Sequence, residues 1–127
     1  MSLRGIRFVK RSGKLVVEQG LGESSVSLRE LAAQSGFRVD RMCRRLGVSG
    51  RHFQRLFQEA VGMAPKEWLK AERMVAARHR LREGGAVKEV AMDLGYTQTA
   101  TFSREFLLCY GVQPTTFVQR SAARAAG

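Results

Sequence analysis

Apolar side chains recur every three or four residues over most of this chain, from about Ser27 to Gln119. Residues spaced in this way lie on one face of an α-helix, so the pattern predicts a series of amphipathic helices. Serine, proline and glycine interrupt the pattern at positions typical of helix ends. The predicted helices cover, to within a residue or so, positions 28–35, 39–46, 50–61, 66–83, 87–94, 98–109 and 114–119.

The two ends of the chain follow different patterns. Ile6–Val9 and Leu15–Val17 are short β-type runs on either side of residues 11–13, Arg-Ser-Gly, which favour a tight turn. We expect a β-hairpin, which must pack on the helices, pair with another chain or stay mobile, because an isolated hairpin is marginally stable. Leu21–Ser25 is rich in Gly and Ser and is interpreted as a linker. Residues 121–127 are mostly small, and we expect a disordered tail there.

The helical region contains an internal sequence repeat. An apolar stretch closed by glycine, a Phe-x-Arg-x-Phe stretch and a Gly-x-x-Pro stretch occur in the same order in both halves. The matching segments are Val39–Gly47 and Val87–Gly95, Phe53–Phe57 and Phe102–Phe106, and Gly62–Pro65 and Gly111–Pro114. The first pair is offset by 48 residues and the others by 49, so the one extra residue falls after the glycine, where a turn can absorb it. A repeat this regular indicates a duplicated structural unit.

Each half has the plan of a helix-turn-helix motif, with a short helix, a glycine turn and a longer second helix. The glycine suits a left-handed turn that costs a residue with a side chain about 1 kcal/mol or more. Ser49, after the first turn, is a natural N-cap for the second helix. The outer face of that helix is then free to enter a DNA major groove.

The charge of the chain agrees with a nucleic-acid partner. Its 22 Lys and Arg residues exceed its 11 Asp and Glu residues, which gives a formal net charge of +11 over 127 residues. This excess favours a polyanion, nucleic acid first and an anionic membrane surface second. A hydrophobic content of 44% is enough for a core and excludes a wholly disordered chain. No apolar run is long enough for a membrane helix and no signal-peptide pattern is present, so we expect a cytoplasmic protein.

The second helix of the first motif, predicted at residues 50–61, is called the first reader helix. Its outer face has side chains suited to base recognition. Arg51 and Arg55 are four residues apart and share a face, and each can donate two hydrogen bonds to guanine, worth about 1–3 kcal/mol of discrimination. Gln54 can pair with adenine or bind a phosphate. His52 lies at the helix start, where a phosphate contact and a solvated or capping role are equally open.

The matching face in the second half is smaller and less charged. It carries Gln98, Thr99, Ala100, Ser103 and Arg104. Ala100 and Thr101 are suited to contact thymine methyl groups, whereas Thr99 and Ser103 are unselective hydrogen bonders. Arg55 and its counterpart Arg104 are also open to a structural role, in salt bridges at the edge of the core. We expect the second helix of the first motif to discriminate strongly between base sequences, and that of the second motif to discriminate weakly and to tolerate differences in DNA shape. The chain should therefore bind an asymmetric DNA site rather than a palindrome.

The remaining residue types are expected to be structural. The repeated phenylalanines and Phe117 belong to the core rather than to stacking platforms for bases. The long helix is expected to bury Trp68, Leu69, Met74, Val75 and Leu81. Cys43 should be buried and Cys109 should lie near a helix end, and their spacing fits neither a metal site nor a disulfide framework. Without a recognisable nucleophile–base pair, metal cluster or phosphate loop, we expect no enzyme, no metal and no cofactor.

These motifs resemble the DNA-binding domain of the AraC/XylS family of transcriptional regulators, over about residues 27–120. The resemblance is carried by Leu46–Phe57, Gly62–Leu69, Arg73–Ala77, Val90–Tyr96, Phe102–Phe106 and Gly111–Pro114. It implies seven helices, in two helix-turn-helix subdomains joined by the long helix. It also implies that both second helices enter successive major grooves about 34 Å apart. A linking helix of about 18 residues, roughly 27 Å long, agrees with that separation.

The resemblance also assigns roles to residues. Base-reading positions fall on Arg51, Arg55, Thr99, Ala100 and Arg104, and phosphate-contacting positions on His52, Gln54 and Ser103. Ala64 and Ala86 depart from the family, because they stand where it often has a capping Ser or Thr worth about 1 kcal/mol. Only about 26 residues precede the first helix, too few for an effector-binding barrel. The sequence therefore gives no basis for naming a small-molecule effector.

The predicted fold is all-α, with two helix-turn-helix subdomains joined by a long linker helix and a short N-terminal β-hairpin. The predicted segments are residues 1–26, 27–65, 66–83, 84–120 and 121–127. The predicted function is a sequence-specific transcriptional regulator that reads two adjacent major-groove segments of double-stranded DNA, with RNA polymerase as a further candidate partner. The alternatives are a non-specific architectural nucleic-acid-binding module and an adaptor whose hairpin pairs with another chain. The operator and the oligomeric state stay open.

Overall fold

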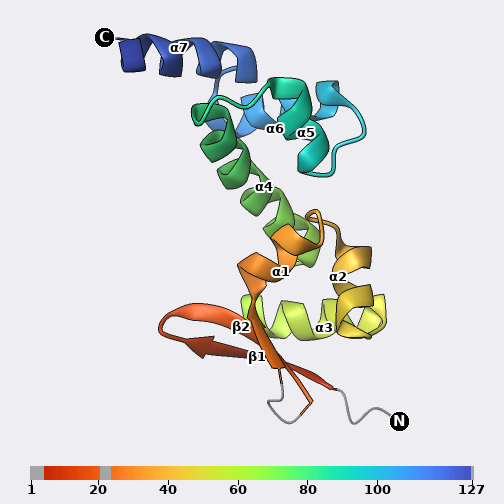
Figure 1. Cartoon of the computed structure of the whole chain (residues 1–127). Helices are drawn as coiled ribbons and strands as arrows, with labels where there is room; N and C mark the ends of the chain where they lie inside the picture. Colours follow the sequence, from red (N-terminus) through yellow and green to blue (C-terminus); the bar gives the residue numbers. More distant parts are fainter. Residues whose placement is uncertain (1–4, 21–23, 127) are drawn as a thin grey trace. The chain divides into compact units, whose positions relative to one another are not determined.

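The computed structural model describes residues 5–20 and 24–126, which contain a small antiparallel sheet and seven α-helices (Figure 1). The strands are β1 (Ile6–Arg11), β2 (Lys14–Gln19) and β3 (Ser24–Ser27). The helices are α1 (Leu28–Gln34), α2 (Val39–Leu46), α3 (Gly50–Val61), α4 (Pro65–Arg82), α5 (Val87–Asp93), α6 (Thr99–Tyr110) and α7 (Pro114–Ala126). The predicted helical fold with two helix-turn-helix motifs is confirmed.

The chain divides into two compact units, Met1–Lys70 and Ala71–Gly127, with the division inside α4. The first unit contains the sheet and helices α1, α2 and α3. The second contains α5, α6 and α7. Each unit therefore has one helix-turn-helix motif and one end of α4. The finer prediction, in which the long helix is a separate linker segment, stays a prediction.

The first helices begin and end where local chemistry requires. The hydroxyl of Ser27 accepts a hydrogen bond from the backbone N–H of Glu30 at 3.0 Å, as the Ser-x-x-Glu spacing predicts. Pro65 opens α4, where its fixed φ and missing N–H suit the first helical position. Past the end of α1, Phe37 adopts a left-handed backbone at φ 59°, and its N–H donates to the carbonyl of Ala32 at 2.8 Å.

The sheet contains the expected hairpin and one strand that we did not expect. Ser12 and Gly13 form the turn between β1 and β2, with φ values of 54° and 78° that match the twist of a two-residue hairpin. The predicted linker Leu21–Ser25 is partly wrong, because β3 begins at Ser24 and pairs antiparallel with β2; residues 21–23 lie outside the described residues. Backbone hydrogen bonds of the ladder outweigh the weak strand preference of serine.

The sheet packs on helix α3 through aromatic rings. Phe8 of β1 lies 6.1 Å from the ring of Phe53 and 5.7 Å from that of Phe57, measured between ring centroids. Val17, its partner across the ladder, is completely buried. The hairpin is therefore part of the core of the first unit, which explains why a pair of strands that is marginal alone is stable here.

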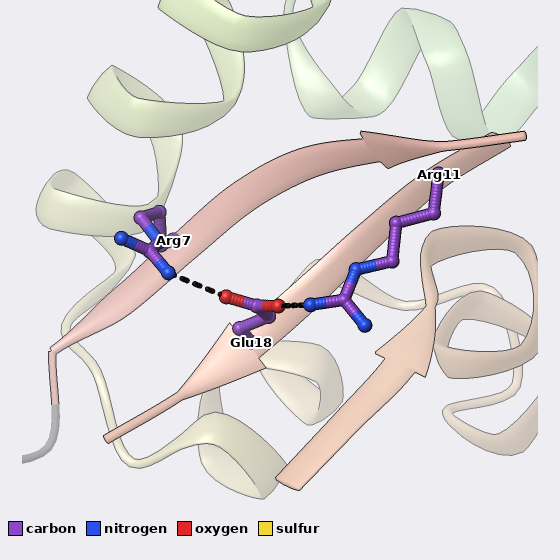
Figure 2. A network of polar contacts seen from close by, with 3 residues as sticks. All are labelled: Arg7, Arg11 and Glu18. Atoms are coloured by element: carbon purple, nitrogen blue, oxygen red, sulfur yellow. Dashed lines mark hydrogen bonds and ion pairs between the residues drawn. The ribbon is translucent and has the colours of Figure 1, made fainter. Parts of the chain in front are cut away.

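The opposite face of the sheet carries a charged network (Figure 2). Glu18 of β2 is almost completely buried between Arg7 and Arg11 of β1 and pairs with both, at 2.7 Å from Arg7 Nη2. The hydrogen bond from Arg7 lowers the pKa of Glu18, and the charges of Arg11 and Arg7 lower it further against the opposing effect of burial. One carboxylate thus links both ends of β1 to β2.

The core of the second unit repeats the aromatic pattern of the first. Phe102 and Phe106 are completely buried, as predicted, and Phe106 lies 4.8 Å from the ring of Tyr110 and 5.6 Å from that of Phe117. The hydroxyl of Tyr110 donates a hydrogen bond to the carbonyl of Met74 at 2.8 Å, which fixes the end of α6 against α4.

Three expectations about helix faces and ends need correction. Val75 is 51% exposed rather than buried, because it lies on the solvent side of α4. Trp68 and Phe117 are half-buried at the core edge rather than within it. Helix α7 continues to Ala126, so the expected disordered tail from Ser121 is helical over that range. Alanine has the highest helix propensity, which outweighs the absence of large apolar anchors in this segment.

Candidate nucleic-acid interface

The first helix-turn-helix motif is held by the two residues that the sequence singles out. Gly47 ends α2 in a left-handed conformation at φ 69°, and the next N–H, of Val48, donates to the carbonyl of Cys43 at 3.1 Å. Ser49 then caps α3, since its hydroxyl accepts a hydrogen bond from the N–H of His52 at 3.1 Å. A Cβ added at Gly47 would meet no atom within 4 Å, so glycine is favoured there by backbone conformation alone.

Helix α3 presents the predicted side chains on its outer face. Arg51, Gln54 and Arg55 are exposed, while Phe53 and Phe57 are buried behind them. His52 is half-buried, and its Nδ1 lies 3.2 Å from Nη2 of Arg55. Because a guanidinium only donates, Nδ1 of His52 is the acceptor in this contact. The contact restricts the motion of Arg55 while leaving it exposed.

The first reader face extends further than the sequence interpretation proposed. Gln58 and Glu59 line one shallow surface groove together with Arg51, Gln54 and Arg55. They are four residues beyond Gln54 and Arg55, so the i, i+4 rule was the signal that could have found them. Glu59 brings a carboxylate to this face, which can accept a hydrogen bond from cytosine but repels phosphate.

The second motif uses a different device to hold its turn. Gly95 is left-handed at φ 91°, and the N–H of Tyr96 donates to the carbonyl of Ala91 at 3.0 Å. Gln98 stands at the N-cap of α6 without a capping side-chain bond. Instead, the hydroxyl of Tyr96 donates to the carboxylate of Glu105 within α6. This bond ties the second turn to the side of α6, whereas the serine cap of the first motif satisfies a backbone N–H at the start of α3.

The environment of Tyr96 belongs to the scaffold rather than to a reacting site. Burial, with the hydrogen bond to Glu105, raises the pKa of Tyr96 well above its usual range, so the phenol stays protonated. The guanidinium of Arg73 lies 5.4 Å from the ring centroid. The ring centroid also lies 5.3 Å from that of Phe102, with the two rings tilted at 59°.

Helix α6 presents a smaller and more apolar outer face than α3. Ala100 and Arg104 are exposed, and Thr99 and Ser103 are half-buried. Further along the helix, Leu107 is 37% exposed and Leu108 is 75% exposed at the positions that match Gln58 and Glu59. The eight predicted site residues thus fall on two helices, four on the outer face of each, and α6 continues into an apolar surface that the sequence interpretation missed.

The cysteines and acidic residues form no second kind of site in the described part of the chain. Cys43 is buried, which raises the pKa of its thiol, and the carboxylate of Asp40 acts in the same direction. Cys109 is exposed near the end of α6, as expected. No cluster of three or more metal-ligating side chains occurs among residues 5–20 and 24–126. Within the same residues, no helix combines the length and apolar character needed to cross a membrane.

Comparison with known proteins places this geometry in a family. A model described as a helix-turn-helix domain matches residues 42–120. The chain is 31% identical over 86 residues to an HTH-type transcriptional regulator of Mycobacterium tuberculosis, which covers 67% of this chain and 33% of that protein. It is 27% identical over 89 residues to the probable transcription factor PqrA of Proteus vulgaris, covering 69% and 73%. It is 32% identical over 100 residues to the probable thc operon regulatory protein of Rhodococcus erythropolis, covering 76% and 30%.

Solved structures are similar over about three quarters of the chain. The DNA-binding domain of AdpA, a global transcriptional factor in complex with a target DNA, superposes with a TM-score of 0.62 at 27% identity and covers 75% of this chain and 92% of that one. A DNA-binding transcriptional dual regulator from Escherichia coli K-12 superposes with a TM-score of 0.63 at 23% identity, covering 75% and 88%, and supports the fold alone. The chain spans about a third of the Mycobacterium and Rhodococcus proteins.

Proposed function

The chain belongs to the AraC/XylS family of DNA-binding, helix-turn-helix transcriptional regulators, and from this membership we propose that it reads one asymmetric duplex site with two unequal helices. Helix α3 reads one block of base pairs and α6 reads the other. The observation that carries the proposal is the repeated placement of an exposed arginine, Arg55 and Arg104, on the outer face of a second helix.

The first block is read mainly by hydrogen bonds. Arg51 and Arg55 are exposed on one face of α3, and each can donate two hydrogen bonds to a guanine. Gln54 lies between them and binds either an adenine or a phosphate, while His52 at the start of the helix binds a phosphate. We expect this block to contain guanine and to tolerate few substitutions.

The second block is read mainly by shape. Arg104 is the one cation among the four residues proposed for this face, and Ala100 is small enough to approach a thymine methyl group. Thr99 and Ser103 bond bases or phosphates with little selectivity. The second block therefore discriminates weakly between base pairs, whereas the first discriminates strongly. Because the two blocks differ, a single chain binds an asymmetric DNA site.

Selection from random duplex DNA tests the proposal. It should return a motif of two blocks centred about ten base pairs apart, as expected for successive major grooves. Arg51→Ala or Arg55→Ala should relax the preference in one block only, and Arg104→Ala in the other. Equal affinity for all sequences, combined with a steep salt dependence, would instead identify a non-specific architectural module. A ratio of specific to random affinity above about a thousand excludes that alternative.

The proposal also covers partners and location. We place the protein in the cytoplasm, with RNA polymerase as a candidate partner of the DNA-bound form and with no catalytic step or cofactor of its own. A mobility shift of the DNA complex that moves further on addition of polymerase holoenzyme, and only with the selected DNA motif, tests the polymerase contact. The ratio of chain to DNA in the same complex measures how many copies bind one site.

A further inference from the structure

A groove lined by α4 and α7 in the second unit collects four arginines. Arg78 and Arg82 reach it from α4, and Arg120 and Arg124 reach it from α7. The groove has a volume of about 620 Å³, and the aromatic rings of Tyr110 and Phe117 form part of its wall. We refer to this site, defined by these four arginines, as the arginine groove.

Two of the arginines are held by aromatic rings. The guanidinium carbon of Arg78 lies 5.3 Å from the ring centroid of Tyr110, and that of Arg82 lies 5.8 Å from the ring centroid of Phe117. Both rings pack against Phe106 in turn. A guanidinium that stacks on a fixed ring keeps the N–H groups at its edge available, so these donors are positioned before any ligand arrives.

The positive charge of the groove is not balanced by the protein. Among the described residues, no lining side chain is acidic, and none of the four arginines has a carboxylate partner within the 4.0 Å limit of an ion pair. Glu83, next along the chain from Arg82, lies instead 3.4 Å from His79. Four like charges around one groove repel each other, so an anion that enters it is attracted by all four.

The arrangement fits a short row of phosphates. Arg78 and Arg82 are four residues apart on α4, and Arg120 and Arg124 are four apart on α7, so each pair forms a row on one helix face. All four cations are arginines, whose forked donors bind phosphate oxygens two at a time. The volume is within the range of about 300–1,000 Å³ that small-ligand sites occupy. We propose that the arginine groove binds a small polyphosphate anion, with two or three phosphate groups in a row.

The groove is separate from the face that α6 presents to DNA. The groove includes Tyr110, which is the last residue of α6. The residues of α6 that we propose to contact DNA end at Arg104. Six residues of helix correspond to about 9 Å along the axis. Because Arg78 and Arg82 already lie over the rings of Tyr110 and Phe117, recognition depends on phosphate oxygens rather than on the stacking of a base.

Calorimetry without DNA tests the proposal, using inorganic tripolyphosphate, adenosine triphosphate and adenosine monophosphate at near-physiological salt. Tripolyphosphate should bind saturably, and the monophosphate should bind at least tenfold more weakly. The double variant Arg120→Gln/Arg124→Gln should weaken tripolyphosphate binding at least tenfold, because it removes two charge-assisted contacts. The two arginines that lie over the rings of Tyr110 and Phe117, Arg78 and Arg82, are kept, and circular dichroism should show unchanged helix content.

A matched control separates the groove from the overall charge. Lys66→Gln/Lys70→Gln removes the same charge from an exposed i, i+4 pair on α4 outside the groove. The affinity of this variant for tripolyphosphate should stay within about twofold of the wild-type affinity. Comparable affinity for tripolyphosphate and adenosine triphosphate supports recognition of the phosphate chain alone. Tighter binding of adenosine triphosphate would still place a polyphosphate in the groove, but it would overturn the inference that the nucleoside contributes nothing.

Three results overturn the proposal. The first is the absence of saturable tripolyphosphate binding, including the case in which only an acidic peptide binds. The second is an equal loss in both double variants, which leaves net charge as the sole cause. The third concerns the slope of DNA affinity against salt concentration on logarithmic axes. If this slope decreases in Arg120→Gln/Arg124→Gln by the amount expected for about two lost phosphate contacts, the groove binds the DNA backbone. Since the calorimetry contains no DNA, failure here leaves the proposed reading of DNA by α3 and α6 untouched.

Discussion

The ring of His52 accepts a hydrogen bond from Arg55 one turn further along α3, with 3.2 Å between Nδ1 and Nη2. Sequence reasoning treats the two residues separately, one as a phosphate contact and the other as a base reader. Their contact joins the two roles, because the ring restricts the arginine before DNA is bound. A long side chain that is already restricted loses less entropy when it binds a base.

This contact predicts that His52→Ala weakens binding to the selected DNA by about 0.5–1.5 kcal/mol, the usual worth of one hydrogen bond. Arg55→Ala should cost about 1–3 kcal/mol. A double-mutant cycle with both changes, measured by fluorescence anisotropy, should give a combined loss smaller than the sum of the two. If His52 contacts only a phosphate, the two losses add and His52→Ala weakens random and selected DNA alike.

The two helix N-caps allow a matched test of stability. Ser49 caps α3 with φ −71° and ψ 156°, and Ala86 occupies the cap of α5 with φ −72° and ψ 140° but has no side chain that can accept a hydrogen bond. Ser49→Ala should lower the free energy of unfolding by about 1 kcal/mol, and Ala86→Ser should raise it by a similar amount. Thermal unfolding followed by circular dichroism measures both. A serine at position 86 that leaves stability unchanged would show that its hydroxyl does not reach the first turn of α5.

Substitution of either glycine after α4 should destabilise the chain, but for different physical reasons. Gly84 has a left-handed backbone at φ 102°, so its requirement is conformational. A Cβ at Gly85 would lie 2.8 Å from Cγ2 of Val90 and 3.1 Å from the carbonyl oxygen of Arg80, so its requirement is space. Gly85→Ala should destabilise the chain by about 1–3 kcal/mol, as overpacking does.

Gly50 supplies the control for that substitution. It opens α3, and a Cβ there would meet no atom within 4 Å. Gly50→Ala should therefore leave stability unchanged or raise it by up to about 1 kcal/mol, because alanine has fewer unfolded conformations to lose. Chemical denaturation of both variants checks the contrast, and equal effects would contradict a steric role for Gly85.

Local patterns predicted the scaffold closely. Gly47, Ser49 and Pro65 act at helix ends through their own backbone or side-chain chemistry, so nearby sequence was sufficient to place them. The β3 strand was missed because Ser24 and Ser25 gain their strand conformation from pairing with β2, which no local pattern contains. The helical end of α7 was missed for a different reason, because small residues at a chain end are typical of a weakly structured tail, whereas alanine has the highest helix propensity.

The candidate surfaces also include features that local sequence determines and features that depend on side-chain or tertiary packing. The outer face of α3 could be predicted from i, i+4 spacing, and the position of each residue on its helix followed from the repeat. The hydrogen bond between His52 and Arg55 depends on side-chain rotamers, which spacing does not determine. The arginine groove was also out of reach, because Arg78 and Arg120 are 42 residues apart and meet only through the packing of α4 and α7.

The network of Glu18 with Arg7 and Arg11 predicts a pH-dependent stability of the first unit. The pKa of Glu18 is lowered from an ordinary value of 4.5, so the folded state favours the ionised carboxylate. Its contribution is therefore fully present above about pH 4.5 and is lost as the pH falls through the lower, folded-state pKa. Glu18→Gln should reduce the free energy of unfolding at about pH 7, since it removes the charge while keeping the shape. The difference between the two proteins should shrink as the pH falls through the lowered pKa of Glu18, where the wild-type carboxylate becomes protonated. Urea unfolding at about pH 7 and over a descending series of acidic pH values measures this. A difference that stays constant over the series would assign the contribution of Glu18 to packing rather than to charge.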